Sequence, residues 1–303
     1  MVFSAKIEDK DIPRLVQSAH LQRCTEGLEE YYQSSSYGNF DGLYIRIKRG
    51  KIQIKCSLHK IFYKEAFGSL DNSKMFTLTN ALSTTINLFE SLQIDRRKVK
   101  VTYYEIGLNL PVQTDPLKYI EMMSYAGQNK EMFNDANFQK NRQRTTEKSK
   151  NIKKVLKVYD KGFEARDKGK KIEGDILRIE TIYRRQSIPL LTLTSYDYLV
   201  KLTGRFFRDW HSVEFPRKIC PDKGLKSSQI EKAQSLMLLG REEYLRQNRQ
   251  NYLAGTLTKK QWETIRVFVK GWDELKDKFR FAPSSEETDY KNTLSEMYQI
   301  ATF

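Results

Sequence analysis

Long apolar runs are missing from this 303-residue chain. No stretch of about 18 consecutive apolar residues occurs, so the sequence predicts no membrane-spanning helix. The first residues, Met1 to Lys6, also lack the charged and then apolar layout of a signal peptide. With 39% apolar and 30% charged residues, the composition is typical of a soluble globular protein. We therefore expect one large domain or two modest ones.

Cysteine and histidine are scarce, with three of each. The cysteines, odd in number and widely spaced, are Cys24, Cys56 and Cys220. They match neither a zinc signature nor a disulfide framework, which favours a reducing compartment. The histidines are His20, His59 and His211. No two of them form a His-x-His pair, so a classical three-histidine metal site is excluded.

Acidic residues are too few to balance the basic ones. Lys and Arg total 53 against 38 Asp and Glu, which gives a net charge of +15. Such an excess indicates a polyanionic partner, although evenly spread charge would also fit a cationic protein without one. Here the charge is clustered, because thirteen residues between Lys140 and Lys171 are basic and only four are acidic. Aromatic residues, 12% of the chain, can stack unpaired bases while lysines track phosphates.

The first part of the chain mixes helical and strand patterns. A polar segment over residues 8–32 is predicted as a helix. Alternating residues over 43–48 and 51–59, separated by Arg49-Gly50, predict a β-hairpin. An amphipathic helix is predicted over 76–93 and a strand over 100–110.

The pattern changes along the rest of the chain. A short helix over 115–124 has Pro116 in its first turn. Residues 127–154 lack apolar periodicity and are predicted as a long mobile loop. Two further strands are predicted over 155–161 and 176–183.

Helical patterns dominate after Pro189. They cover residues 195–208, 227–239, 242–253 and 258–278, with Thr258 as an expected N-cap. Trp262 and Trp272 are expected in the core of this region, and the acidic tail after Phe281 is expected to be loosely ordered. The sequence thus predicts an α+β fold: an antiparallel sheet with helices on one face, then a helical C-terminal region. The expected domains are residues 1–190 and 195–303.

Strand alternation gathers polar side chains on one face of the predicted sheet. Alternate residues of a strand share a face, so a single antiparallel sheet would bring a defined set together. That set is His59, Glu105, Asn109, Tyr159, Lys161, Arg178 and Glu180. Carboxylates and a histidine can hold Mg²⁺ or Mn²⁺, which polarises a phosphate. A tyrosine hydroxyl can attack phosphorus, and neighbouring lysines would lower the pKa of the phenol.

Each of these residues also has a plain structural interpretation. Any strand with one solvated face alternates in the same way. Taken alone, Tyr159 is more often a surface tyrosine than a nucleophile. Glu180, flanked by Arg178 and Arg184, is more often part of an ion pair than a metal ligand. The periodicity leaves both interpretations open.

Several segments resemble motifs of rolling-circle replication initiators. Residues 156–164, LKVYDKGFE, and residues 176–184, ILRIETIYR, resemble the paired (I/V)YDK and RxE motifs of that family. The closest likeness is to phage and plasmid proteins related to the strand-nicking initiator of filamentous phages. Residues 54–61, IKCSLHKI, resemble a Ser-Leu-His-Lys motif, and residues 104–109, YEIGLN, resemble the acidic strand that follows it. Order and spacing agree over residues 40–185, and the helical remainder is only loosely similar.

The resemblance implies a fold and an activity. The fold would be a palm-like, RRM-like sheet of the Rep type, forming a nicking endonuclease domain over residues 1–190. The activity would be cleavage of one strand at a replication origin. It would leave a 5′-phosphotyrosine and a free 3′-OH that primes synthesis. Glu105 and Glu180, helped by His59, would hold the Mg²⁺ or Mn²⁺ ion.

The resemblance leaves two tyrosines as candidate nucleophiles. Tyr159 lies in the segment that resembles the nucleophile segment of the filamentous-phage initiators. Tyr125-Ala126-Gly127 matches a Tyr-x-Gly element that carries the nucleophile in related plasmid initiators. Tyr159 is favoured over Tyr125, and Lys161 would bind phosphate oxygens near either.

The resemblance further implies a protein of the bacterial cytoplasm that binds origin DNA, with host replication proteins as further partners and no membrane. Residues expected to contact DNA are Lys55, Asn109, Lys140, Arg142, Arg144, Lys148, Lys150, Lys153, Lys154, Lys157 and Arg178. One alternative is a non-catalytic DNA- or RNA-binding protein on the same sheet. It accounts for charge and aromatics but not for carboxylates on the binding face. A mobilisation relaxase with the same chemistry is the other alternative.

Overall fold

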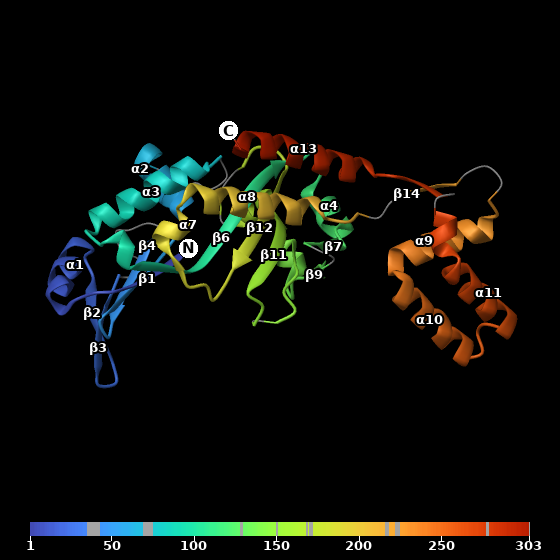
Figure 1. Ribbon diagram of the computed structural model, residues 1–303, viewed down its shortest axis with the longest axis horizontal. Helices are drawn as coiled ribbons and strands as arrows, with labels where there is room; N and C mark the ends of the chain where they lie inside the picture. The colour runs from blue at the N-terminus through green and yellow to red at the C-terminus, as the bar shows by residue number, and fades with distance from the viewer. Residues whose placement is uncertain are drawn as a thin grey trace.

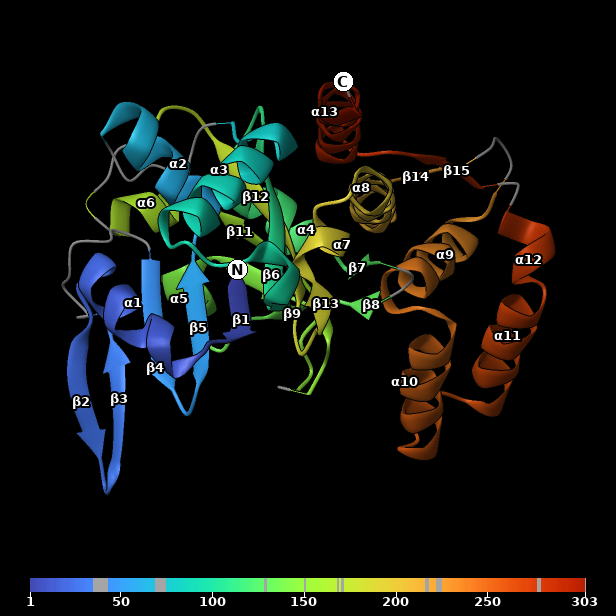
Figure 2. The ribbon, with the colours of Figure 1, turned by 60° about the vertical axis from the view of Figure 1, so that its left-hand side comes forward.

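The computed structural model describes residues 1–34, 43–68, 75–127, 130–149, 151–167, 169, 172–215, 218–221, 225–276 and 279–302. A large antiparallel sheet lies at the centre, with several helices over one of its faces (Figures 1 and 2). A further group of helices stands to one side of the sheet (Figure 1). The chain is therefore a mixed α+β protein, as its sequence predicts. No helix in these ranges is both long enough and apolar enough to cross a membrane.

Eleven strands form the central sheet of the described chain. Their order is β2-β3-β4-β5-β1-β6-β12-β11-β10-β9, and β13 pairs with β6 beside this path. The bounds are β1 (Val2–Lys6), β2 (Gln22–Glu26), β3 (Glu29–Gln33), β4 (Leu43–Lys48), β5 (Lys51–Cys56), β6 (Val99–Pro111), β9 (Phe133–Asn134), β10 (Gln143–Thr145), β11 (Lys154–Asp160), β12 (Ile176–Tyr183) and β13 (Ile188–Pro189). β6 links two halves of the sheet, because its residues 99–103 pair with β1 and residues 104–111 with β12.

The helices lie mostly between these strands in the sequence and after them. Their bounds are α1 (Ile12–Ser18), α2 (Leu58–Phe67), α3 (Leu78–Ser91), α4 (Pro116–Met122), α5 (Phe138–Asn141), α6 (Lys161–Asp167), α7 (Leu190–Leu193), α8 (Tyr196–His211), α9 (Ser227–Leu239), α10 (Arg241–Leu253), α11 (Lys259–Lys270), α12 (Trp272–Leu275) and α13 (Ser285–Thr302). Four short strands lie outside the central sheet: β7 (Tyr125–Ala126), β8 (Lys130–Glu131), β14 (Lys218–Pro221) and β15 (Phe279–Ala282).

Two hydrophobic cores lie between the sheet and its helices. The first joins β1, β4, β5 and β6 to helices α1, α2, α3 and α7. The second joins β6, β11 and β12 to α4, α8 and α13. Within the second core, the indole of Trp210 on α8 donates a hydrogen bond to the Thr181 hydroxyl of β12 (3.1 Å). The hydroxyl of Tyr290 on α13 donates to the Trp210 carbonyl (2.9 Å), so both helices are fixed to the sheet.

Helices α9 to α12 have a third core of their own, which we call the helical unit. Its buried residues are Ala233, Leu236, Tyr244, Ile265, Phe268 and Val269. The chain enters this unit through β14 and leaves it through β15, and these two strands pair with each other. The predicted boundary near residue 190 does not coincide with this packing, because α8 and α13 share a core with the sheet.

Several sequence-based elements are confirmed. The hairpin β4–β5 turns at Arg49 and Gly50, which both have positive φ as a tight two-residue turn requires. Helix α3 and strand β6 lie where the apolar periodicity predicts them. Helix α4 begins at Pro116 with an Asp115 side-chain cap. Thr258 caps α11, with Gln261 completing a capping box.

The predicted helix over residues 8–32 is wrong. A 3₁₀ turn over Asp9–Asp11 and the short α1 form there, and residues 22–33 form the β2–β3 hairpin instead. Gly27, at the turn, has a φ of +65°. Tyr32 then pairs with Ile47 of β4, which joins the hairpin to the sheet. Pairing with a distant strand outweighs the local helical pattern here.

The basic stretch over residues 127–154 and the C-terminal tail also differ from expectation. Among its described residues, the basic stretch contains β8, β9, α5 and β10 rather than one long loop. β10 pairs with both β9 and β11 and so extends the sheet. The tail forms α13, whose Tyr290 and Leu294 are fully buried against the second core. The predicted helix over 258–278 divides into α11 and α12 at Gly271.

Candidate functional site

Antiparallel register places the motif residues next to one another on β6, β12 and β11. Lys157 lies opposite Glu180, and Tyr159 lies opposite Arg178. On the other side of β12, Arg178 lies opposite Asn109 and Glu180 opposite Gly107. The residues that alternate with these, such as Leu156 and Ile179, belong to the second core. The motif residues therefore project from the face of the sheet turned away from that core, which we call the outer face.

Glu180 is the centre of a hydrogen-bonded group on the outer face. Its Oε1 accepts from the Tyr159 hydroxyl (3.2 Å) and from Nε of Arg178 (2.7 Å). Its Oε2 lies 3.4 Å from Nζ of Lys157. Nη1 of Arg178 also donates to Oδ1 of Asn109 (2.8 Å), which links β12 to β6. We call these five residues, Asn109, Lys157, Tyr159, Arg178 and Glu180, the Glu180 cluster.

Burial and charge set the ionisation of this cluster. Tyr159 and Glu180 are each only 6% exposed. Burial raises the pKa of Tyr159, and the neighbouring Glu180 carboxylate raises it further. Burial alone would also raise the pKa of Glu180, but the charges of Arg178 and Lys157 hold that pKa below its usual value. At neutral pH the cluster therefore contains a neutral phenol that donates to a charged carboxylate.

The expectation that lysines lower the pKa of Tyr159 is therefore wrong. The Nζ atoms of Lys157 and Lys161 lie over the aromatic ring, 4.5 Å and 5.9 Å from its centroid. Such contacts are cation–π interactions with the face of the ring and do not involve the phenol oxygen. The Tyr159 hydroxyl itself donates a hydrogen bond to Glu180.

Lys161 lies at the start of α6 rather than on the strand. It is only 3% exposed, and its Nζ lies 2.6 Å from the Glu164 carboxylate. Before it, Asp160 accepts from the Phe163 backbone (2.8 Å) and from Nη1 of Arg142 (3.0 Å). In the YDK motif, Asp160 therefore stabilises the first turn of α6 and joins the connection between α5 and β10 to β11.

The residues predicted to hold a divalent cation do not come together. Glu105 lies on the outer face, is exposed, and accepts a hydrogen bond from the Tyr103 hydroxyl. Glu180 is engaged by two cations and a phenol. His59 lies on α2 instead of a strand, with its ring stacked on Phe76 at 4.6 Å. No three His, Cys, Asp or Glu side chains are grouped to hold a metal ion in the described ranges, so the predicted donor set does not fit Mg²⁺ or Mn²⁺.

Tyr125, the other candidate nucleophile, is not part of the Glu180 cluster. It lies in β7, whose backbone pairs with β8 and with Glu214. Ala126, the next residue, is buried in the second core, and the Gly127 amide donates to the Asp209 carbonyl of α8. β7 therefore lies on the helix-covered side of the sheet, and the structure brings only Tyr159 to the cluster.

Most residues predicted to contact DNA are engaged within the fold. Arg142 pairs with Asp160, and Arg144 donates to the Met123 carbonyl (2.6 Å). Lys148 lies 3.5 Å from the Glu131 carboxylate, and Lys154 lies 2.5 Å from that of Asp209. Lys157, Arg178 and Asn109 belong to the Glu180 cluster. Lys55, Lys140 and Lys153 are exposed, and Lys150 lies outside the described residues.

Two features of the outer face were missed in the sequence. Tyr103 and Glu105 form a hydrogen-bonded pair on β6, and burial together with that bond raises the pKa of Tyr103. Their spacing of two residues on a predicted strand was the available signal. Gly107 lies between this pair and the Glu180 cluster, and nothing in its local sequence indicates how closely Arg178 approaches it.

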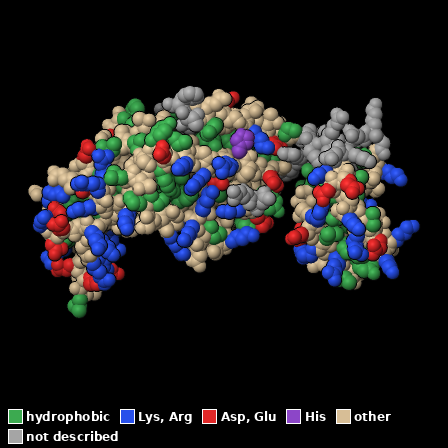
Figure 3. Space-filling model, viewed as in Figure 1, with side chains coloured by type: hydrophobic (Ala, Val, Ile, Leu, Met, Phe, Trp, Pro, Cys, Tyr) green, Lys and Arg blue, Asp and Glu red, His purple; other side chains and the backbone are tan. Residues whose placement is uncertain are grey.

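Basic side chains continue across the outer face of β4 and β5. Arg46 and Lys48 lie over the Tyr31 ring and pair with the Glu26 carboxylate. Lys51 and Lys55 on β5 are exposed. Lys and Arg side chains are visible over the central sheet with its packed helices, which we call the sheet part, and over the helical unit (Figure 3).

No protein-family model matches this chain, and no curated protein resembles it significantly.

Proposed function

We propose that this chain binds single-stranded DNA on the outer face of a palm-like sheet and nicks it with Tyr159, as a rolling-circle replication initiator of a phage or plasmid. One observation carries the proposal: the Tyr159 hydroxyl donates to Glu180 within a group of three cations, Lys157, Lys161 and Arg178. These residues also carry the resemblance to the initiator motifs. Three further observations support the sheet as the platform: antiparallel strands, helices on the opposite face, and exposed lysines on β5.

The proposed reaction is a transesterification. Oη of Tyr159 attacks the phosphorus, the bond from phosphorus to the 3′ oxygen breaks, and a 5′-phosphotyrosine and a 3′-OH result. The phenol proton passes to Glu180, to which it is already hydrogen-bonded, and the leaving oxygen takes a proton from water. A bound phosphate would compete with Glu180 for Arg178 and Lys157. Loss of these contacts raises the pKa of the carboxylate, which makes Glu180 a better base when substrate is present.

The test is detection of a covalent adduct. Supercoiled plasmid carrying the replicon, and single-stranded fragments of it, are incubated with the full chain in Mg²⁺, in Mn²⁺ and in chelator. Mass spectrometry of the trapped peptide identifies the linked tyrosine. We expect an adduct with the wild-type chain and with Tyr125→Phe and Tyr103→Phe, and none with Tyr159→Phe. A wild-type chain that nicks no DNA in any condition, or an adduct that survives Tyr159→Phe, contradicts the proposal.

A non-catalytic single-strand binder is the second candidate. It is favoured by the charge balance of the cluster, in which Glu180 is matched by Arg178 and Lys157 and the pKa of Tyr159 is raised. Such a protein would bind DNA with full affinity in Tyr159→Phe and form no adduct in any variant. A mobilisation relaxase would form the same adduct, and cleavage at a transfer origin instead of a replication origin would distinguish it.

A further inference from the structure

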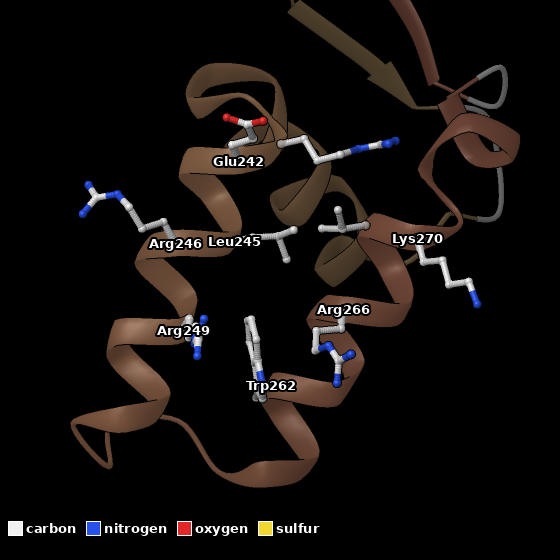
Figure 4. Close-up of a pocket in the computed structure, with 9 residues that line it drawn as sticks. Glu242, Leu245, Arg246, Arg249, Trp262, Arg266 and Lys270 are labelled. Atoms are coloured by element: carbon white, nitrogen blue, oxygen red, sulfur yellow. The ribbon is translucent and has the colours of Figure 1, made fainter.

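The helical unit contains a basic groove far along the chain from the Glu180 cluster. It lies between α10 and α11 and has a volume of about 530 Å³, within the range of roughly 300–1,000 Å³ that ligand sites occupy. Among its lining residues are five cations and one tryptophan: Arg241, Arg246, Arg249, Arg266, Lys270 and Trp262. Glu242 is its single acidic lining residue. We call this feature the α10–α11 groove (Figure 4).

The cations of the groove are available to an anion. Arg246 pairs with Glu243 on its own helix, and Arg266 pairs with Glu263. Both pairs are solvent-exposed, and exposed pairs contribute little because water screens them. Neither Arg249 nor Lys270 has an ion-pair partner in the described part of the chain. An incoming phosphate would therefore displace only weak interactions.

Trp262 presents an aromatic ring between these cations. Figure 4 shows the ring between the two helices, with Arg249 on one side and Arg266 on the other. The ring is half-buried and stacks on Tyr252, with the planes inclined by 13°. The capping box of Thr258 and Gln261 fixes the first turn of α11, which carries Trp262. The expectation that Trp262 is a core residue is therefore only partly met, since it packs on the third core and also lines the groove.

We propose that the α10–α11 groove binds a single strand of nucleic acid, with a base against Trp262 and phosphates on Arg249 and Arg266. Flat aromatic rings flanked by cations suit unpaired bases, because every base has a face that can stack and every nucleotide carries a charge. An acidic peptide would use the cations but has no need of the tryptophan. The inference deepens the proposed function by giving the nicked strand a second contact.

Salt dependence of binding tests the phosphate contacts. A fluorescent oligothymidine is titrated with the full chain at several salt concentrations, and the slope of log K against log salt is compared between variants. Each phosphate contact contributes about 0.7 to this slope for single strands, so Arg249→Gln/Arg266→Gln should reduce it by about 1.4. The matched control is Lys259→Gln/Lys260→Gln, which removes two charges from the exposed start of α11 outside the groove. Equal slope changes in both variants would overturn the inference.

Trp262 provides an independent measurement. Trp262→Ala should weaken oligothymidine binding roughly 5- to 150-fold, since stacking of a base on an aromatic ring contributes on that scale. Trp262→Phe, which keeps an aromatic ring in the third core, should retain most of the affinity, and thermal unfolding confirms that both variants fold. An iodouracil-substituted oligonucleotide should crosslink at Trp262 under ultraviolet light. Crosslinks only elsewhere, or stronger competition by an acidic peptide than by oligothymidine, would contradict a nucleic-acid groove.

The two proposals can fail separately. If the chain forms no tyrosine adduct but shows the Trp262-dependent affinity and crosslink, the proposed nicking activity is wrong and the nucleic-acid groove stands. A chain that forms the Tyr159 adduct and binds oligothymidine independently of Arg249, Trp262 and Arg266 retains the nicking activity and loses the groove.

Discussion

Gly107 leaves the space that the Arg178 guanidinium occupies. A Cβ atom at position 107 would lie 2.5 Å from Nη2 and 3.0 Å from Cζ of Arg178. It would also lie 3.1 Å from Cγ of Glu180. Arg178 in turn holds both Glu180 and Asn109, so the absence of a side chain on β6 is a condition for the geometry of the whole Glu180 cluster.

Gly107→Ala should therefore destabilise the fold and weaken activity together. Forcing an extra methyl group into a packed site typically costs about 1–3 kcal/mol. Because Arg178 must move, we expect the Tyr159 adduct to decrease more than thermal stability alone explains. The control is Gly204→Ala in α8, where no atom lies within 4 Å of the added Cβ. That change should stabilise the chain by about 0.4–1 kcal/mol, since alanine favours helix. Equal effects of the two substitutions in chemical denaturation would contradict the steric argument.

Glu180 should make the free energy of unfolding depend on pH in the acidic range. The pKa of the Glu180 carboxyl is lower in the folded chain than in the unfolded chain. The carboxylate therefore contributes its full stabilisation above the unfolded pKa, roughly 4.3. This contribution to the free energy of unfolding is lost as the pH falls through the lower folded pKa. Glu180→Gln leaves Arg178 buried without its carboxylate, which costs about 3–5 kcal/mol at neutral pH. The difference in the free energy of unfolding between wild type and Glu180→Gln should shrink as the pH is lowered below about 4.

Glu243 gives the matched comparison for this prediction. Arg246 and Gln247 lower the pKa of Glu243 to about 2, but 37% of the Glu243 side chain is exposed to solvent. Exposed pairs are screened by solvent and contribute little to folding. Glu243→Gln should therefore change the acid limb of the stability curve much less than Glu180→Gln. An equal change would show that burial does not decide the contribution of the pair.

Local sequence patterns predicted the strands that carry the candidate site. They missed elements that depend on pairing with distant strands. Strands β6, β11 and β12 follow apolar alternation, so their positions in the chain and the shared face of Glu105, Tyr159 and Glu180 could be predicted. The β2–β3 hairpin could not, because pairing with β4 stabilises it from a distance. The sequence left open whether Glu180 is ion-paired or holds a metal ion, and the structure pairs it with Arg178. The pair of Arg142 with Asp160 was not expected, because it depends on side-chain directions that residue types alone do not define.

Tyr159 should remain protonated at a pH where an ordinary tyrosine ionises. Its pKa is raised by burial and by the Glu180 carboxylate, so it should contribute no phenolate absorbance near 295 nm at about pH 10. The absorbance difference between wild type and Tyr159→Phe should be near zero there in the native state. In denaturing urea the two chains should differ by one titrating phenol at that pH. A native-state difference at pH 10 would mean that the hydroxyl is solvated rather than held by Glu180.

Helix α13 should be required for the stability of the sheet part. Leu294 is fully buried in the second core, beside Tyr290, which donates to the Trp210 carbonyl. Leu294→Ala should cost about 2–5 kcal/mol, through the lost burial and the cavity left behind. Glu296, two residues on, is exposed, and Glu296→Ala should stay within about 0.5 kcal/mol of wild type. Because the helical unit has a core of its own, Leu294→Ala should lower the unfolding midpoint measured through the Trp210 environment more than that measured at Trp262. Equal losses at both tryptophans would show that the sheet part and the helical unit unfold as one.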